Sequence, residues 1–161
     1  MDKENLLKGI YQDGKALGAC SAFSEAKSVK EIVDELFTPQ GVEFCLKLRF
    51  PTLDVFRQFD KEEVKQYGVY IDCGEIELAD PKRAFLVGNT KATVKCTKTQ
   101  SNSIYLMHGA SVSVVASGFA IVRVEGDKKS HISYIQNDHA KVLVQKFRLA
   151  APLDVHRAVD R

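Results

Sequence analysis

The chain has 161 residues, 45% hydrophobic and 27% charged, with four cysteines and no tryptophan. This length can bury a core without disulfides, and no two cysteines form a C-x-x-C pair, so free thiols in a reducing compartment are expected. No apolar run approaches the roughly 20 residues needed to cross a bilayer, and the first residues are too charged for a signal peptide. We therefore expect a soluble, cytoplasmic protein with no membrane partner.

The net charge of +2 conceals a division between the two halves of the chain. Residues 1–80 contain 10 Lys and Arg against 16 Asp and Glu, whereas residues 81–161 contain 13 against 5. Such a division favours packing of one half on the other, an acidic partner for the second half, or head-to-tail contact between molecules. Lysines at the outward positions of a repeat surface would explain it equally well.

The first 68 residues are predicted to be mainly helical. Apolar residues at helical spacing predict helices over 4–17 and 24–37, and Thr38-Pro39-Gln40-Gly41 is expected to end the second. Residues 42–50 alternate between apolar and other residues and lead directly into a proline, which favours a strand. Pro51 suits the first turn of a short helix to Phe59, and Asp60 suits the cap of another through Gln66.

From Val69 the apolar period changes to two, and a short pattern then recurs. A small residue followed by alternating apolar residues begins at Ala92, Asn102, Ala110, Ala120, Ser130 and Ala140, with a degenerate instance at Ala84. Each segment predicts a short strand with one apolar face. We therefore divide the chain into an acidic, mainly helical head (1–80), a basic β-repeat array (81–148) and a C-terminal capping segment (149–161) with a helix near 152–159.

Two architectures fit the repeats within an α+β fold. In a β-solenoid the strands coil about one axis and their apolar residues fill the interior, which suits the near-constant spacing and the small residue at each corner. In an antiparallel meander or sandwich the strands pair as hairpins on the helices, which suits the connectors of three to five residues. We favour the solenoid, with the head covering one open end and the C-terminal segment the other.

Few residues indicate chemistry. The chain has no phosphate-binding, dinucleotide-binding, serine-hydrolase or zinc-protease motif, and no cofactor or metal site is predicted. His131 and His139 occupy similar positions of adjacent repeats but lack further ligands, so surface histidines are expected. Cys45, Cys73 and Cys96 occupy apolar positions and are expected in the core. Hexapeptide-type solenoids include acyltransferases with an intersubunit histidine, which leaves His108 or His139 as candidates, but their glycine-containing six-residue repeat is absent here.

The remaining candidate for a binding surface is a set of cations at outward positions of the repeats. A rigid row of lysines could follow a phosphate backbone, although few aromatic side chains accompany it. The candidate residues are Lys91, Lys95, Lys98, Arg123, Lys128, Lys129 and Lys141.

The repeats, together with GVEFCLKLRFP from Gly41 and YGVYIDCG from Tyr67, resemble small uncharacterised proteins of prophages and mobile elements in gut bacteria. The resemblance covers about 42–145 and implies a helical head followed by β-helical repeats. It carries no catalytic residues over to this chain. We therefore expect a non-enzymatic scaffold that presents its repeat surface to a protein partner or self-associates. The alternatives are a nucleic-acid or anionic-ligand binder that uses the basic residues, and an acyltransferase-like enzyme.

Overall fold

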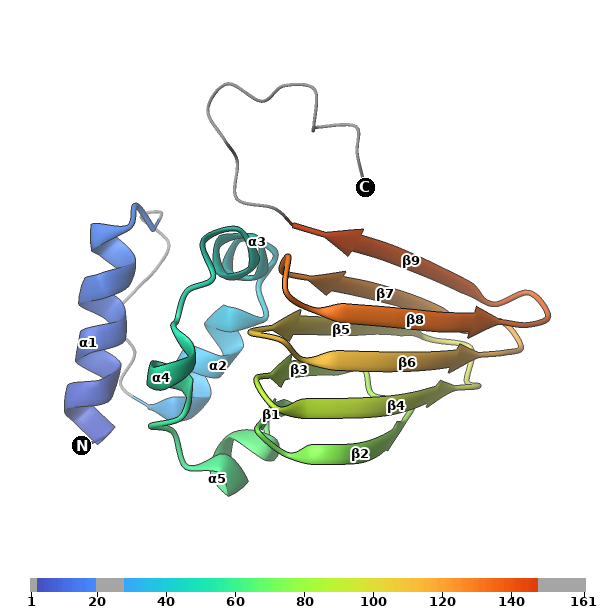
Figure 1. The fold of residues 1–161 in the computed structure, drawn as a ribbon, viewed down its shortest axis with the longest axis horizontal. Helices are drawn as coiled ribbons and strands as arrows, with labels where there is room; N and C mark the ends of the chain where they lie inside the picture. The colour runs from blue at the N-terminus through green and yellow to red at the C-terminus, as the bar shows by residue number, and fades with distance from the viewer. Residues whose placement is uncertain (1–2, 20–27, 148–161) are drawn as a thin grey trace.

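The computed structural model describes residues 3–19 and 28–147, which form a helical head beside a stack of parallel strands (Figure 1). The helices are α1 (Lys3–Ala16), α2 (Val29–Leu36), α3 (Pro39–Leu48), α4 (Leu53–Phe56) and α5 (Lys61–Lys65). The strands are β1 (Val69–Ile71), β2 (Gly74–Ala79), β3 (Arg83–Val87), β4 (Thr90–Cys96), β5 (Ser101–Met107), β6 (Ser111–Ala116), β7 (Ile121–Gly126), β8 (His131–Gln136) and β9 (Lys141–Lys146). None of the described helices is long and apolar enough to span a bilayer.

The prediction for residues 42–50 is wrong, because they belong to helix α3 rather than to a strand. Thr38 caps this helix by accepting a hydrogen bond from Gly41 N, and Pro39 occupies its first turn, so the motif expected to end one helix also begins the next. The buried residues of α3 are Val42, Cys45 and Leu46, a helical spacing that the alternation of aromatic and aliphatic residues conceals.

Gly41 is required where α2 turns into α3. A Cβ atom at this position would lie 2.0 Å from the carbonyl oxygen of Glu35, so no larger residue fits without moving the backbone. The helix predicted over 4–17 corresponds to α1. Of the helix predicted over 24–37, residues 24–27 lie outside the described residues, and α2 begins after its cap Ser28. Asp60 caps α5 as expected. The short helix predicted for 51–59 is confined to α4.

The strands form a β-solenoid of about four turns, which confirms the favoured architecture and rules out the meander. Two parallel sheets face each other, one ordered β1-β3-β5-β7-β9 (sheet A) and the other β2-β4-β6-β8 (sheet B). Each turn contains one strand of each sheet, and residues 20 apart are stacked from Arg83 onward, as in Ala84 with Ile104. The ten-residue repeat of the sequence is therefore half of one turn.

The interior consists of aligned columns of small and aliphatic side chains. Val94 stacks on Val114, and Ile104 stacks on Val124, with all four side chains buried. The repeats are not all in one phase, however. Ala110 and Ser130 share a corner column with Thr90, whereas Ala92 stacks on Val112. The shorter step of eight residues between Asn102 and Ala110 marks this change of phase.

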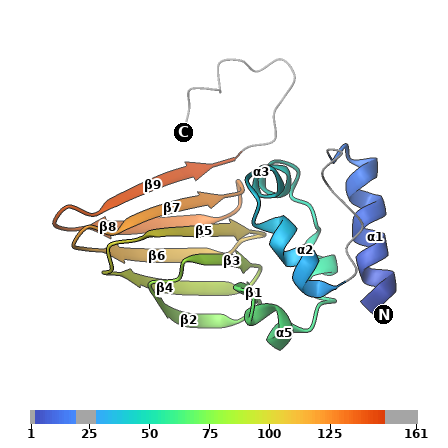
Figure 2. The same ribbon diagram turned by 180° about the vertical axis from the view of Figure 1, so that it is seen from behind.

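The head packs against the outer side of sheet A. Phe85 and Tyr105 are outward residues of β3 and β5, and their rings contact Phe37 at centroid distances of 5.8 and 6.0 Å. Phe56 and Met107 belong to the same buried cluster, so the head and the first turns share one core. Figure 2 shows the helices gathered at one end of the strands, where the strands of sheet A finish.

The solenoid begins earlier than the boundary predicted at residue 80. Strands β1 and β2 pair in parallel with β3 and β4, so Val69 already belongs to the first turn. The capping segment predicted for 149–161 lies outside the described residues.

Candidate functional site

The last described turn of the solenoid, strands β8 and β9, exposes two inward side chains whose counterparts in the preceding turn are buried. Tyr134 occupies the same inward column as Val114, yet Tyr134 is 48% exposed and Val114 only 1%. Val144 likewise continues the column of the fully buried Val124 and is exposed. These inward side chains are uncovered because no described strand follows β8 or β9 in its sheet.

Outward positions of the last turns are apolar as well. Ile135 is 60% exposed on the outer face of β8, and Leu143 is 53% exposed on that of β9. In the same two columns the preceding turns have Val115 and Arg123. Within the described residues, six of the eight exposed large hydrophobic side chains lie in the last turn or just before it, with Ile121 and Leu143 on the outer face of sheet A and Ile135 on that of sheet B. The six are Phe119, Ile121, Tyr134, Ile135, Leu143 and Val144. We call these six residues, with the edges of β8 and β9, the open end.

The open end also carries backbone groups that could form further hydrogen bonds. In a parallel sheet, the outer edge of the last strand presents N–H and C=O groups to the next strand. Among the described residues no strand occupies that place beside β8 or β9. The open end therefore combines apolar side chains with a β-edge of two six-residue strands, the combination that strand addition uses.

The opposite end of the solenoid differs in chemistry. Helix α5 lies against β1, so part of the first turn is covered by the head (Figure 1). Strand β2 is an edge strand with the acidic residues Glu75 and Glu77 at its outward positions. Its inward residues, Ile76 and Leu78, are half-buried and continue the interior columns. Charged outward residues on an edge strand oppose indiscriminate pairing with strands of other molecules. Strand β8 has no such Asp, Glu, Lys or Arg residue.

The structure does not bring the seven predicted cations together. Lys91 and Lys95 lie on the outer face of β4 in sheet B, and Arg123 and Lys141 belong to β7 and β9 of sheet A. The remaining three lie in turns at the two opposite ends of the strands: Lys98 follows β4, and Lys128 and Lys129 follow β7. Lys91 is also adjacent to Glu75 in the register of β2 and β4. These cations form no continuous basic face.

Aspartates join neighbouring turns at both corners of the solenoid. Asp127, fully buried, accepts hydrogen bonds from His108 N in the preceding turn and from Lys129 N and Ser130 N in its own. At the far corner, Asp80 accepts from the N–H groups of Thr97 and Lys98. These two hydrogen bonds hold the pKa of Asp80 below its usual range.

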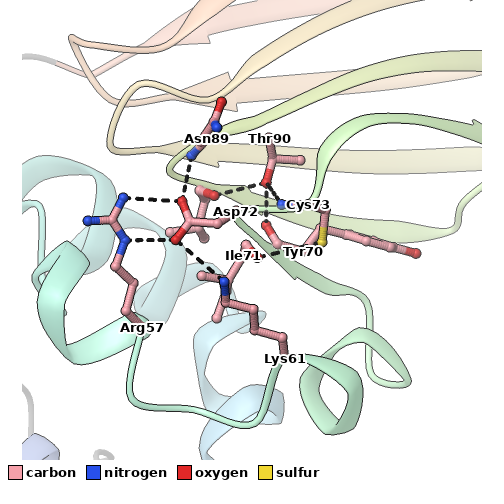
Figure 3. Close-up of polar contacts among 9 residues, drawn as sticks. Arg57, Lys61, Tyr70, Ile71, Asp72, Cys73, Asn89 and Thr90 are labelled. Atoms are coloured by element: carbon pink, nitrogen blue, oxygen red, sulfur yellow. Dashed lines mark hydrogen bonds and ion pairs between the residues drawn. The ribbon is translucent and has the colours of Figure 1, made fainter.

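The largest polar cluster lies where the head meets the first turn (Figure 3). Arg57 donates from Nε and Nη2 to the two carboxylate oxygens of Asp72, at 2.7 and 3.3 Å, and Asn89 N donates to the same carboxylate. The bonds from Arg57 are the main reason that the pKa of Asp72 is lowered. Asp72 has a φ of 49°, a left-handed conformation that aspartate tolerates in turns.

Thr90 completes this junction from the inside. Its buried hydroxyl accepts a hydrogen bond from Cys73 N and lies within donating distance of the carbonyl oxygens of Tyr70 and Val87. These hydrogen bonds, with the ion pair of Lys61 and Asp72, hold the ends of α4 and α5, the β1–β2 turn and the β3–β4 turn together. We interpret the cluster as a structural junction.

The histidines that the sequence offered for acyl transfer are engaged in packing. His108 has a φ of 60°, and its Nε2 donates to the carbonyl oxygen of Pro51 at 2.8 Å. Burial lowers the pKa of this imidazole, against the opposing effects of that hydrogen bond and of Asp127. His139 stacks on Phe119 at a centroid distance of 4.9 Å, so it does not stack on His131.

Cys45 and Cys96 have the environment of core residues and not that of activated nucleophiles. Burial raises the pKa of Cys45 to about 12 and that of Cys96 to about 11, opposite to the shift that a reactive thiol needs. Cys73 is half-buried, and its thiol donates to the carbonyl oxygen of Ile71 at 3.6 Å. The prediction that these thiols are core residues is confirmed for Cys45 and Cys96.

One hollow of about 510 Å³ lies among α1, α2 and α3. Its lining is mainly apolar, with Ile10, Ile32 and Phe44 among the contributors, and it includes Ala19, next to the segment 20–27. We assign no ligand to this hollow. Within the described residues, no group of three or more His, Cys, Asp or Glu side chains is placed to hold a metal ion.

Comparisons of the chain with protein-family models, with curated proteins and with solved structures found no match. Sequence reasoning selected the cations and missed the open end, although one signal was present. Ile121 and Leu143 are apolar at outward positions where the preceding turn has Ser101 and Arg123, and Ile135 follows Val115 in a column that has Lys95 two turns earlier.

Proposed function

We propose that this protein is a non-enzymatic interaction scaffold that binds a protein partner at the open end of its solenoid. The observation that carries the proposal is the exposure of the inward residues Tyr134 and Val144 beside edges of β8 and β9 that no described strand covers, although Val142 N of β9 already donates to Gln136 Oε1. Ile135 and Leu143 flank these edges on the two opposite outer faces, Ile135 on sheet B and Leu143 on sheet A. Exposed apolar clusters on soluble proteins mark interaction sites. The rest of the molecule acts as a rigid support, since each turn is fixed to the next by a parallel ladder and by corner aspartates.

Strand addition is the mode of binding that this surface supports best. A partner strand would complete the ladder of β8 or β9 through main-chain hydrogen bonds and would cover Tyr134 or Val144 with its own side chains. The scattered positions of the cations give no comparable support to a nucleic-acid interface, which needs them along one track. A phage or mobile-element origin, implied by the resemblance of the repeats, stays a prediction.

Site-specific photo-crosslinking tests this function. A photoreactive phenylalanine analogue replaces Ile135 in the last turn and, as a matched control, Lys95, which lies in the same outward column two turns earlier. In cells that express the full chain, we expect protein adducts from position 135 and few from position 95. Equal yields at the two positions would remove the assignment of the open end as the binding surface.

A further inference from the structure

The two ends of the solenoid differ in charge. The first turn, residues 69–80, contains four carboxylates and no lysine or arginine, whereas residues 128–146 of the last turn contain four lysines and one carboxylate. Opposite charges on opposite ends steer two molecules toward head-to-tail contact and disfavour contact between like ends. The edge strand of the acidic end is β2, and that of the basic end in sheet B is β8.

The strand register shows that these two edges are also complementary in residue type. Within sheet B, the inward column that begins at Leu78 continues through Val94 and Val114 to Tyr134. A further β2 strand placed in parallel beyond β8 would add another Leu78 beyond Tyr134 and cover both half-exposed side chains. Similarly, Ile76 would lie beside Ile132, so that both partly buried residues become interior.

The outward columns match in the same register. The column Glu75, Lys91, Ser111, His131 would continue with a second Glu75, so that an imidazole and a carboxylate become neighbours. The outward column that ends at Ile135 would continue with Ala79 of the second copy. An uncharged residue would then lie beside the exposed Ile135. At the corner, Lys128 and Lys129 precede β8 as Asp72 and Cys73 precede β2, but Arg57 and Lys61 already pair with the Asp72 carboxylate, so this corner adds no attraction to the contact.

We propose that the partner at the open end is a second copy of this chain, which adds its β2 edge in parallel to β8. This inference rests on the proposed function, because it names the occupant of the same surface. The contact joins two different surfaces of the molecule, so it is heterologous and each copy keeps one free end. Head-to-tail stacking therefore generates open chains of subunits that grow with protein concentration.

The strength of this contact is limited by its size. One six-residue strand pair with its flanking side chains covers less area than the roughly 1,200–2,000 Å² of a stable interface. The assembly is accordingly weak and reversible, and part of its strength is electrostatic. Raising the salt concentration should shorten the chains, because exposed charges are screened within about 10 Å at 0.1 M.

A charge exchange between the two edges tests the register directly. Ser133 is exposed on β8, and its outward column runs back through Ser113 and Thr93 to Glu77. In the proposed contact, Ser133 therefore lies beside Glu77 of the next copy. Ser133→Glu sets two carboxylates side by side and should weaken association about tenfold or more. Ser133→Lys, the matched control of opposite sign, should strengthen it.

Mixing two variants separates a head-to-tail contact from a symmetric one. The purified full-length S133E and E77K proteins are each studied by sedimentation velocity over a range of concentrations, and then as an equimolar mixture. We expect each variant alone to associate less than the original chain. The mixture should regain long assemblies, because the carboxylate introduced on β8 of one variant meets the ammonium group introduced on β2 of the other. Unfolding curves confirm that each variant is folded before it is compared.

Two sizes in solution would overturn the inference: a monomer at every concentration, or a closed dimer. It would also be overturned if E77K alone assembled like the original chain and its mixture with S133E formed no longer assemblies than S133E alone. Each leaves the proposed function separately testable. If position 135 still yields adducts with other proteins in cells, the open end binds a different partner. If it yields none, both the scaffold function and its self-association fail.

Discussion

The middle turns and the last turn of the solenoid have the same inward pattern but opposite surroundings. Val114 is covered by the strand that follows it, whereas Tyr134, one turn later in the same column, is half-exposed. The difference shows that in a repeat protein the role of a residue depends on its neighbouring turn more than on its own repeat. Among the described strands, the middle turns bury these columns and therefore stabilise the solenoid, whereas the last turn leaves them exposed and is the turn where we propose that a partner binds.

The last turn is not merely an unfinished copy of the others. His131 on β8 replaces Ser111 of β6, and Ser133 repeats Ser113, but Ile135 extends the column of Val115 with a much more exposed aliphatic side chain. On β9, Leu143 replaces the Arg123 of β7. A chain whose last turn served only to end the solenoid would be expected to have polar residues at these outward positions.

The largest expected effect contrasts a buried column residue with an exposed one. Leu106→Ala removes a fully buried side chain that stacks on Leu86, and should lower the free energy of unfolding by about 3 kcal/mol. Tyr134→Ala in the last turn should cost less than about 1 kcal/mol, because this side chain is already half in water. Urea denaturation of the two variants measures both values. Equal losses would mean that the last turn is covered in solution.

The corner aspartates give the second contrast. Asp127→Ala leaves three backbone N–H groups without their acceptor in a buried corner and should cost about 2 kcal/mol. Asp138→Ala, at the exposed corner before β9, removes one acceptor for Gly118 N and should cost less than about 1 kcal/mol. Asp127→Asn retains an acceptor oxygen and is the control. If D127N loses as much stability as D127A, the negative charge rather than the hydrogen-bond geometry is what stabilises the corner.

The solenoid could be predicted from the sequence because its signal is local and repeated. Alternation of apolar residues at Val112, Val122 and Val142 fixes which side chains face inward, and a ten-residue spacing leaves room for only one strand and one turn. Residues 42–50 were mispredicted because Phe44 and Leu48 add an apparent alternation to a helix whose buried face is Val42, Cys45 and Leu46. The capping hydroxyl of Thr38, rather than the apolar pattern, was the decisive signal there.

The candidate site could not be predicted in the same way, since exposure depends on which turn comes last. Tyr134 and Val114 have the same phase in the sequence, and only the three-dimensional order of strands distinguishes them. The cations were conspicuous in the sequence but lie on two faces and two ends, because successive ten-residue repeats alternate between sheet A and sheet B. Lys95 and Arg123 therefore face opposite sides of the molecule.

The stability of the corner near the head, which contains His108, should depend on pH. The pKa of His108 is lowered in the folded protein, mainly by burial, so the folded state binds fewer protons than the unfolded state. The free energy of unfolding should therefore fall as the pH drops below about 6.5, the usual pKa of histidine, and level off below the lowered value. Denaturation at several pH values between about 8 and about 5 measures this slope.

His108→Asn is the matched control for this measurement. Asparagine tolerates the left-handed backbone of residue 108 and does not titrate. Its shorter side chain does not replace the hydrogen bond from Nε2 to the carbonyl oxygen of Pro51, so the variant is compared by the slope of its stability with pH and not by its absolute stability. The variant should lose the part of the slope that lies just below about pH 6.5. An unchanged slope would assign the pH dependence to another group.

The smallest expected effect tests whether the junction in Figure 3 stabilises the solenoid or only attaches the head. Arg57→Met removes the fork that binds Asp72 and, because the guanidinium is about half exposed, should cost less than about 1 kcal/mol. Asp72→Ala also removes the acceptor of Asn89 N, a bond between two turns, so it should cost more than R57M. Denaturation at low and high salt measures both losses of unfolding free energy. High salt should reduce the loss in R57M, whereas the part of the loss in D72A that comes from the hydrogen bond of Asn89 should persist. If the two variants lose equal stability at high salt, Asp72 stabilises the protein only through Arg57. The first turn would then be held mainly by its contact with the head and not by the bond to Asn89.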